Sequence, residues 1–272
     1  MRDEDCVRFL QWCLPPLGLR WAGYRRVRRT VCKRIERRRR ELGLADAAAY
    51  RACLIADPGE WTRLDALCRI SISRFYRDRA VFDRLVCDVL PNLAAKAGRR
   101  ADTALRCWSA GCASGEEPYS LAIAWRYALR ADHPGLRFEI VASDDEPVLL
   151  TRARAARYPA GSLKDLPRDW RAWAFERDGN VFHLRPALRC AAAFCRQDIR
   201  REWPEDRFDL VLCRNLAFTY FAADRQRVVL QRLSERLRRG GILVIGGHEM
   251  LPDGGAGFRR LGSGLPVYRK SS

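Results

Sequence analysis

Short apolar runs that alternate with helix-length segments constrain the fold of this chain more than any other feature. The runs that resemble strands are residues 105–109, 138–143, 208–213 and 241–246. Segments with helical character follow three of them, over residues 118–130, 147–157 and 223–238. Strands that alternate with helices favour a parallel sheet covered by helices. We therefore predict an α/β fold with a doubly wound, mostly parallel, Rossmann-like sheet.

Two parts of the chain lie outside this alternation. Residues 1–69 contain helical segments broken by prolines and glycines, which predicts a basic, all-α N-terminal domain. Residues 70–97 are expected to form a linker and a connecting helix, and residues 98–272 the sheet domain. Within the sheet domain, Asp178-Gly179-Asn180 is typical of a hairpin turn, so we predict a small antiparallel β insertion at about 158–197.

Positive charge is concentrated near the N-terminus. The chain has a net charge of +18, and residues 20–40 hold eleven Lys or Arg but a single acid, Glu36. Residues 24–42 predict a basic helix, whose field would attract an acidic protein surface. Nucleic acid is a less favoured partner, and a merely solvated helix face is the alternative to both.

Cysteine, histidine and hydropathy patterns exclude several classes of protein. The eleven cysteines form no Cys-x-x-Cys pair, which indicates reduced, mostly buried thiols. With three histidines and no metal-ligand spacing, we predict no metal site. No apolar run approaches the roughly 18–20 residues that cross a bilayer, and the N-terminus lacks signal-peptide character. We expect a cytoplasmic protein without membrane insertion.

The loop after the first predicted strand, residues 109–117, has the composition of a ligand-binding turn. Gly111 and Gly115 allow backbone to approach a ligand closely. Glu116 and Glu117 at the start of the following helix would repel a pyrophosphate and suit a cationic ligand. S-adenosylmethionine (SAM) is such a ligand, since it carries an ammonium and a sulfonium. The alternative is that the two acids only complement the helix N-terminus.

Two further strand ends carry polar or aromatic side chains. Asp144 ends the second predicted strand, where an acid can accept hydrogen bonds from both ribose hydroxyls of an adenosine. The loop 213–221 follows a buried strand, and its Asn215 can bond a carboxylate or an ammonium. Phe218, Tyr220 or Phe221 could enclose a reacting methyl group. Ligands of open parallel sheets bind at such strand ends, so these residues predict one nucleoside site.

Several of these segments match one known family in order. The segments are Arg74-Phe-Tyr-Arg-Asp78, Trp108-Ser-Ala-Gly-Cys-Ala-Ser-Gly-Glu-Glu-Pro-Tyr-Ser120, Ala142-Ser-Asp144, Phe208-Asp-Leu-Val-Leu-Cys-Arg-Asn215 and Gly246-Gly-His-Glu249. The chain resembles the chemotaxis receptor methyltransferases, the CheR family, from about residue 20 onward. The resemblance implies a class I SAM methyltransferase fold. It also implies methyl esterification of glutamates on receptor helices, with S-adenosyl-L-homocysteine as product.

The resemblance also assigns residues to the cofactor site. They are Ser71, Ser73, Arg77, Gly111, Glu117, Asp144, Asp198, Ile199, Asn215 and Leu216. Among them, Glu117 would meet the methionyl part and Asp144 the ribose, while Asp198 and Ile199 would meet the adenine. Ser71, Ser73 and Arg77 would contact SAM or the acceptor from the linker.

The implied reaction makes modest demands on the protein. A carboxylate acceptor is already ionised at neutral pH, so methyl transfer needs orientation and no general base. We assign acceptor orientation to Arg77 and the methyl pocket to Tyr220, which makes these two the catalytic candidates. A salt bridge from Arg77 to Asp78 or Asp83 is the competing interpretation. His248 is expected to be a structural hydrogen-bonding residue rather than a base.

The chain departs from the family pattern in places that bear on the acceptor. The stretch from Asn215 to Tyr220 is one residue longer than the family pattern, beside the predicted methyl pocket. Residues 9–24, with Pro15-Pro16 and two tryptophans, are not typical of the family. Two alternatives therefore stay open. One is a SAM-dependent methyltransferase with another acceptor, such as a small molecule, a peptide or a nucleic acid. The other is a non-catalytic SAM-sensing protein.

Overall fold

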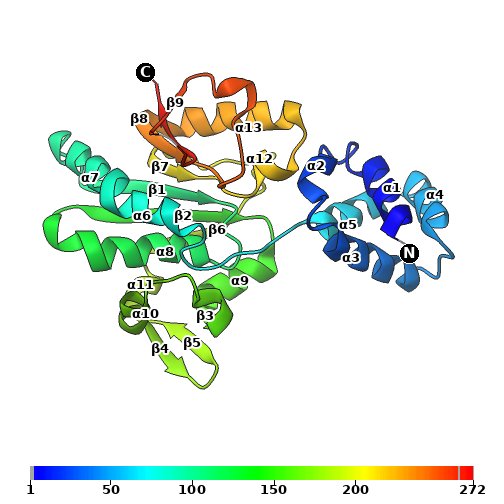
Figure 1. Ribbon diagram of the computed structural model, residues 1–272, viewed down its shortest axis with the longest axis horizontal. Helices are drawn as coiled ribbons and strands as arrows, with labels where there is room; N and C mark the ends of the chain where they lie inside the picture. Colours follow the sequence, from blue (N-terminus) through cyan, green and yellow to red (C-terminus); the bar gives the residue numbers. More distant parts are fainter. Residues whose placement is uncertain (1–2, 263, 272) are drawn as a thin grey trace. The chain divides into compact units, whose positions relative to one another are not determined.

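The computed structural model describes residues 3–262 and 264–271. The chain divides into two compact units (Figure 1). One unit comprises Met1–Ser71 and Thr219–Arg225, and the other comprises Ile72–Phe218 and Gln226–Ser272. We call them the N-terminal unit and the catalytic unit and describe each by itself. Among the described residues, no helix is long and apolar enough to cross a membrane.

The N-terminal unit is helical, as predicted. Its helices are α1 (Asp3–Cys13), α2 (Trp21–Tyr24), α3 (Arg28–Glu41), α4 (Ala47–Ala56) and α5 (Pro58–Cys68). Two aspartates define where helices begin, since the Asp46 side chain accepts from the Ala49 amide and the Asp57 side chain from the Gly59 amide, both at 2.8 Å. Such caps satisfy amides that have no partner within the helix.

The basic helix, α3, begins at Arg28 rather than at Tyr24 as predicted. Residue Tyr24 ends the short helix α2 instead, and Val27 has non-helical dihedral angles between the two. On α3, Val31 and Ile35 are buried one helical turn apart, while Arg29 and Lys33 are exposed. This spacing of apolar residues gives α3 a narrow buried face and leaves the rest of its surface to charged side chains.

A buried ion pair fixes α3 against α5. The Glu60 side chain is only 3% exposed and accepts hydrogen bonds from Arg38 Nε and Nη2, both at 2.9 Å. Tyr50 Oη donates to the same carboxylate at 2.9 Å. Hydrogen bonding by Arg38 lowers the pKa of Glu60 below its usual value of 4.5, against the opposing effect of burial. The charge of Glu60 is therefore satisfied from two neighbouring helices.

Removal of this carboxylate should destabilise the N-terminal unit. We expect Glu60→Ala to lower the free energy of unfolding by about 3–5 kcal/mol, because it leaves Arg38 buried without its partner. The control is Glu41→Ala, whose carboxylate is 51% exposed and contacts Arg38 at 3.4 Å, and it should cost below about 1 kcal/mol. Because the folded pKa is depressed, the contribution of Glu60 is present above about pH 4.5 and lost on acidification. Urea titrations at neutral and acidic pH measure both effects, and equal values for the two variants would contradict the assignment.

The cysteine prediction is wrong at one pair. A disulfide joins Cys6 on α1 to Cys32 on α3, with the Cα atoms 6.0 Å apart. The other cysteines are free thiols, of which Cys13, Cys68, Cys107, Cys112 and Cys213 are buried. No local sequence pattern indicates the pair, because 26 residues separate the two positions and their proximity depends on how the helices pack.

The catalytic unit is built on a seven-stranded sheet. Its strands are β1 (Ala104–Ala110), β2 (Arg137–Asp144), β6 (Ala192–Arg196), β7 (Phe208–Leu212), β8 (Leu237–Val244), β9 (Phe258–Arg260) and β10 (Val267–Lys270). They follow the order β6-β2-β1-β7-β8-β10-β9, in which the first five are parallel and β10 is antiparallel to both of its neighbours. The predicted doubly wound, mostly parallel sheet is confirmed.

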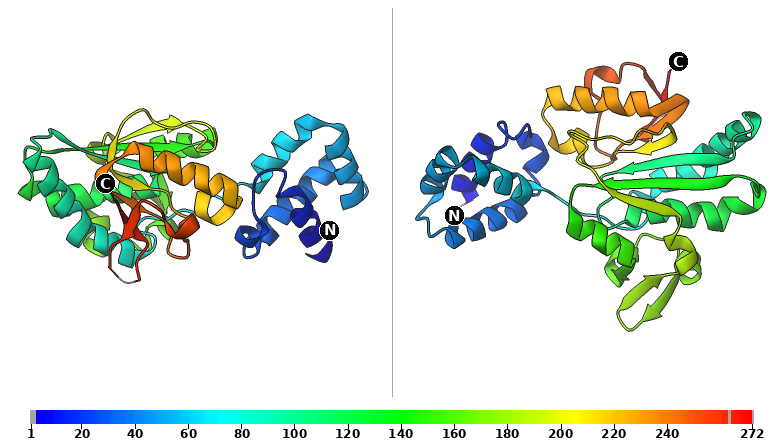
Figure 2. Two further views of the ribbon diagram at one scale, coloured as in Figure 1. Left: turned by 90° about the horizontal axis from the view of Figure 1, so that it is seen from above. Right: turned by 180° about the vertical axis from the view of Figure 1, so that it is seen from behind.

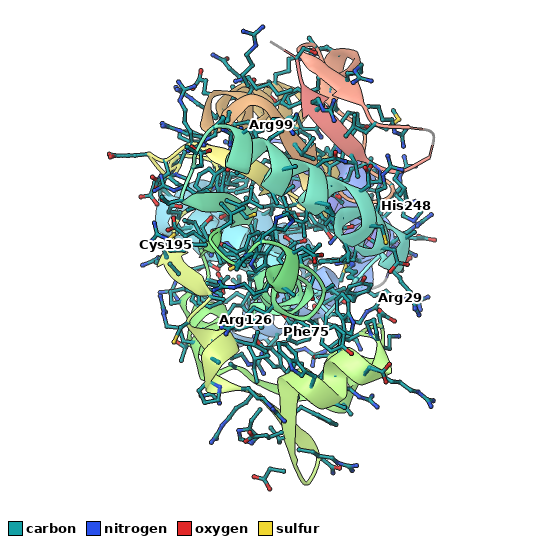
Figure 3. All side chains as sticks on the ribbon, turned by 90° about the vertical axis from the view of Figure 1, so that its left-hand side faces the viewer. Arg29, Phe75, Arg99, Arg126, Cys195 and His248 are labelled. Atoms are coloured by element: carbon teal, nitrogen blue, oxygen red, sulfur yellow. A yellow bond between two sulfur atoms is a disulfide. The ribbon has the colours of Figure 1, made fainter. Side chains whose placement is uncertain are left out.

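Helices cover both faces of this sheet (Figure 1, Figure 3). They are α6 (Arg79–Arg84), α7 (Leu90–Arg99), α8 (Glu116–Ala124), α9 (Pro147–Ala155) and α13 (Ala223–Arg236). The short helix α12 (Ala217–Tyr220) follows β7, and its last two residues belong to the N-terminal unit. A π-helical segment, Leu85–Val89, joins α6 to α7, and another, Trp125–Leu129, extends α8 before a short 3-10 helix, Arg130–Asp132. The main core packs α7 and α8 against one face, where Cys107, Ile140 and Leu210 are fully or almost fully buried.

A small antiparallel sheet is inserted between α9 and β6, as predicted. Its strands are β3 (Arg157–Pro159), β4 (Phe175–Asp178) and β5 (Val181–Leu184), in the order β3-β5-β4. The short helices around it are Ala160–Leu163, α10 (Arg168–Ala174) and α11 (Pro186–Arg189), and a last 3-10 helix lies at Pro252–Gly254. Gly179, with φ of +57°, forms the hairpin turn, and the hairpin projects away from the large sheet (Figure 2).

Candidate active site

The ends of four parallel strands meet at one edge of the large sheet. In the strand register, Ala110 lies beside Ser143, Ser109 beside Leu212, and Leu212 beside Val244. The loops that leave β1, β2, β7 and β8 are therefore neighbours. This is the position at which open parallel sheets bind their ligands.

The glycine loop after β1 is held close to the loop after β7. Gly111 has φ of +78°, and a Cβ atom added there would lie 2.5 Å from Leu216 Cδ2. The Gly111 and Cys112 amides both donate to the Ser143 carbonyl, at 2.8 and 3.0 Å. The left-handed backbone conformation favours glycine at position 111, and the end of the Leu216 side chain lies close to it.

Asp144 connects the first loop to the second. Its Oδ2 accepts from the Ala113 amide at 2.9 Å, and its Oδ1 accepts from the Glu146 amide at 3.0 Å. Ala113 has φ of +49°, which is unusual for a residue with a side chain. Asp144 thus supports the glycine loop in addition to its predicted role with a ribose.

A buried guanidinium joins three segments of the site. The Arg214 side chain is 2% exposed, and its Nη1 donates to Glu117 Oε2 at 3.0 Å. Its Nη2 donates to Asp78 Oδ2 at 2.7 Å and to the Arg77 carbonyl at 2.8 Å. Ser109 Oγ donates to the other Glu117 oxygen at 2.8 Å. Sequence reasoning selected Glu117 but missed Arg214 and Asp78, although both lie within the quoted motifs.

A second acid, Glu249, organises the backbone of the loop after β7. Its carboxylate accepts from the amides of Asn215 at 2.9 Å, Leu216 at 3.2 Å and Gly246 at 2.5 Å. Asn215 has φ of +55°, and a Cβ atom on Gly246 would lie 2.8 Å from Glu249 Oε2. The predicted cofactor residues Asn215 and Leu216 therefore owe their conformation to Glu249, a role that sequence reasoning did not assign.

Glu116 is a buried acid next to the glycine loop. Its side chain is almost fully buried, and its Oε2 has no hydrogen-bond partner among the residues that the structure describes. Burial raises the pKa of Glu116, while its own amide and Ser73 act in the opposite direction. Nearby, Tyr158 Oη donates to the Ser114 carbonyl at 2.8 Å, and burial raises the pKa of this phenol. A buried carboxylate oxygen without a donor suits a cationic or hydrogen-bonding ligand.

Two buried aromatic residues anchor the linker that carries Arg77. The Phe75 ring packs against Tyr158 with centroids 4.7 Å apart, and the Tyr76 amide donates to Ser120 Oγ at 2.9 Å. Arg77 Nη1 donates to the Ile72 carbonyl at 2.5 Å. Arg77 forms no ion pair with any residue in 3–262 or 264–271, so the competing salt bridge to Asp78 or Asp83 is absent.

The remaining predicted residues lie in different places. Asp198 accepts from Arg200 Nε at 2.9 Å, Arg200 Nη2 lies 3.7 Å from Asp145, and Ile199 is buried. Ser71 and Tyr220 belong to the N-terminal unit, unlike the other predicted site residues.

His248 differs from its expected role. Its side chain is exposed, and within the described part of the chain it has no hydrogen-bond partner (Figure 3). The expectation of a structural hydrogen bond is wrong because His248 lies on the outside of the loop after β8, while the neighbouring Glu249 points inward and makes the contacts.

The strand order and the site together define a class I SAM-dependent methyltransferase. The site fits a nucleoside that carries positive charge, because it combines the glycine loop, the buried Glu116 with its unpaired oxygen, and Asp144 at the end of the adjacent strand. Residues 71–263 match the model of the CheR methyltransferase SAM-binding domain. The chain belongs to the CheR methyltransferase family, and its cofactor is SAM.

Curated relatives agree with this family. The chain is 37% identical over 186 residues to a chemotaxis protein methyltransferase from Listeria monocytogenes, a match that covers 68% of each chain. It is 29% identical over 226 residues to a probable chemotaxis protein methyltransferase from Rhizobium etli, covering 80% of this chain and 83% of that one. A third relative is chemotaxis protein methyltransferase 1 from Pseudomonas aeruginosa, 33% identical over 183 residues and covering 65% of each chain.

Loss of the Glu249 charge should weaken cofactor binding. Glu249→Gln places an amide N–H₂ among three backbone N–H donors, and one charged hydrogen bond is worth about 1.5–3 kcal/mol. We expect the Kd for SAM, measured by calorimetry, to rise about 10–100-fold. Glu235→Gln is the matched control, because Glu235 is an exposed acid on α13 paired with Arg232. An unchanged Kd in a folded Glu249→Gln variant would mean that this carboxylate does not organise the cofactor loop.

Proposed function

We propose that this enzyme transfers the SAM methyl group to glutamate carboxylates on an acidic, helical protein such as a chemoreceptor. The observation that carries the proposal is Arg77, a cation on the linker without an acidic partner among the described residues. The names of the curated relatives support a protein substrate of chemotaxis. We further propose residues 1–69 as the substrate-facing domain and residues 98–272 as the SAM-binding domain, connected by residues 70–97.

In this proposal, each part of the cofactor is assigned to residues of this chain. We assign the methionyl part to Glu117, the ribose to Asp144, and the adenine to Asp198 and Ile199. Asn215 and Leu216 would line the pocket opposite Gly111, since Leu216 already contacts Gly111. Ser71 and Ser73 would approach from the linker. Support comes from the hydrogen bonds that hold the Asp144 and Asn215 loops in place.

The chemistry of methyl transfer depends mainly on alignment. When bound, SAM supplies a methyl group on a positively charged sulfur. The acceptor carboxylate is ionised at neutral pH, so this chain needs no general base. Its task is to hold the acceptor oxygen in line with the methyl group and to exclude water, an effect worth up to about 7–11 kcal/mol. In our proposal, Arg77 orients the acceptor carboxylate through its guanidinium, and Tyr220 borders the methyl group.

Recognition of an acidic partner is assigned to α3 and the residues before it. Several arginines of α3 are already neutralised, since Arg38 contacts Glu60, and Arg39 and Arg40 both contact Glu36. Arg29 and Lys33, exposed and four residues apart, form no ion pair with a described residue. They present a short cationic row on one helix face, which suits an acidic helix better than a long polyanion.

The two alternatives remain distinguishable from this proposal. A different acceptor is favoured by one feature, the longer stretch from Asn215 to Tyr220. Nucleic acid is less favoured because so much of the charge of α3 is paired within the protein. A non-catalytic SAM-sensing protein would bind the cofactor without turnover. The cytoplasmic location stays a prediction.

Alkali treatment of the methylated product tests the acceptor. The enzyme is incubated with methyl-tritiated SAM and a purified cytoplasmic fragment of a chemoreceptor. Methyl esters of glutamate release volatile methanol in alkali, so we expect the label to become volatile. A receptor fragment with Gln at the methylated positions is the control and should stay unlabelled. Label that resists alkali would establish another acceptor, and SAM binding without any incorporation would favour the sensing protein.

Arg77 has its own test in the same assay. Arg77→Ala should lower kcat/KM for the receptor fragment about 10–100-fold, because it removes a charged hydrogen-bond donor to the acceptor. Arg77→Lys keeps the charge but loses the planar fork, so an intermediate value is expected. The neighbouring Arg79, which is exposed and lies 3.7 Å from Asp83, provides the control Arg79→Ala. Equal turnover by Arg77→Ala and the wild type would remove the proposed role.

A further inference from the structure

The segment that contains Tyr220 is attached to the N-terminal unit. Leu19 and Phe221 form an isolated antiparallel β-bridge. The Arg20 amide donates to the Tyr220 carbonyl at 2.8 Å, and the Ala222 amide donates to the Gly18 carbonyl at 2.9 Å. These two hydrogen bonds flank the bridge and fix the backbone on both sides of residue 221. The backbone of Tyr220 is thus held by residues far away in the sequence.

Side chains near Gly23 strengthen the attachment. Arg20 Nε donates to the Thr219 carbonyl at 3.0 Å. A Cβ atom on Gly23 would overlap the same Thr219 carbonyl oxygen. The φ of Gly23 is not in the left-handed region, so glycine is needed here for close approach rather than for backbone conformation. Helix α2 therefore packs directly against the backbone that precedes Tyr220.

The Tyr220 side chain has a rigid neighbour. Its ring lies 5.1 Å from the ring of Tyr24, measured between centroids, at an interplanar angle of 58°. Tyr24 is only 2% exposed, and burial raises the pKa of its phenol. A fully packed neighbouring ring restricts the orientations that the Tyr220 ring can adopt.

A tight turn presents these residues. The Gly18 amide donates to the Pro15 carbonyl at 2.8 Å, and the Leu19 amide to the Leu14 carbonyl at 3.0 Å. Leu14 and Leu19 are both buried, so the turn is anchored in the core of the N-terminal unit. Gly18 has φ of +67°, which allows the chain to reverse before it pairs with residues 220–222.

We propose that residues 18–24 form a positioning element for Tyr220, and that Gly23 and Tyr24 are its principal positioning residues. The inference rests on the proposed function, in which Tyr220 borders the transferring methyl group. The positioning element connects the two segments in which the chain departs from the family pattern. These are the atypical residues 9–24 and the longer stretch from Asn215 to Tyr220. The longer stretch thus ends at Tyr220, whose backbone is held by residues 18–24.

Gly23→Ala is the most direct test, because the added methyl group must push the Thr219 carbonyl away. A displacement of about 1 Å near the reacting atoms can cost on the order of 10²-fold in rate. We expect kcat for the receptor fragment to fall by about that factor, while the Kd for SAM changes less than about twofold. Gly98→Ala is the matched control, since Gly98 is also helical and has open space around its Cβ position; its kcat should stay at the wild-type value.

A second pair of variants keeps the test valid if Gly23→Ala folds poorly. Tyr24→Phe preserves the ring and should retain activity, whereas Tyr24→Ala removes the packing surface and should lower kcat. Adding Tyr24→Ala to Tyr220→Ala should cause little further loss, because both changes act through one ring. Retained kcat in Gly23→Ala and Tyr24→Ala, alongside a loss in Tyr220→Ala, would overturn the inference. Normal turnover by Tyr220→Ala would instead refute the proposed role of Tyr220.

Amide hydrogen exchange supplies a readout that needs no acceptor. In the wild type, the Ala222 amide is bonded to the Gly18 carbonyl and should exchange slowly. Gly23→Ala and Tyr24→Ala should accelerate exchange in residues 219–222, and Gly98→Ala should not. Unchanged protection in both Gly23→Ala and Tyr24→Ala would contradict the positioning element whatever the acceptor is.

Discussion

The catalytic unit depends on one buried cation, Arg214. A guanidinium taken out of water is unfavourable unless carboxylates and carbonyls replace its hydration. The replacement comes from Glu117 at the start of α8 and from Asp78 with the Arg77 carbonyl on the linker. Two segments that are distant in sequence, the start of α8 and the linker, must therefore converge on the end of β7. Arg214 at the sheet edge thereby fixes the linker at Arg77 and Asp78. This contact determines the path of the linker past the site.

Backbone strain is concentrated in the same region. Tyr76, Asp78, Ala113 and Asn215 all have positive φ, a conformation that costs energy for residues with side chains. Each strained stretch has a compensating acceptor or donor nearby: Asp144 accepts from the Ala113 amide, and Glu249 accepts from the Asn215 amide. Strain that is maintained by hydrogen bonds to carboxylates indicates loops that are set in position before a ligand arrives.

The sequence predicted those features that local patterns determine. Alternating strands and helices gave the parallel sheet, and the Gly179 turn gave the insertion. What it missed depends on pairs that only the folded chain brings together. The Arg38–Glu60 pair neutralises part of α3 across 22 residues, and Glu249 reaches Asn215 across 34. In neither pair does the sequence around one residue indicate its partner. The unpaired charge of α3 is therefore overestimated from the sequence, and Glu249 is assigned no role.

The charge balance of the site has a consequence for the rate. In the proposed reaction, methyl transfer from a sulfonium to a carboxylate reduces charge, so the transition state is less polar than the reactants. Bare carboxylates around the sulfur would stabilise the reactants more than the transition state and would slow the reaction. In this chain three of the acids at the strand ends are already engaged, since Glu117 contacts Arg214, Glu249 three backbone amides, and Asp144 two; of the acids at this edge, Glu116 has an oxygen, Oε2, that is left without a donor among the described residues. Carboxylates that are paired with donors within the protein can help to bind the cationic cofactor without slowing methyl transfer.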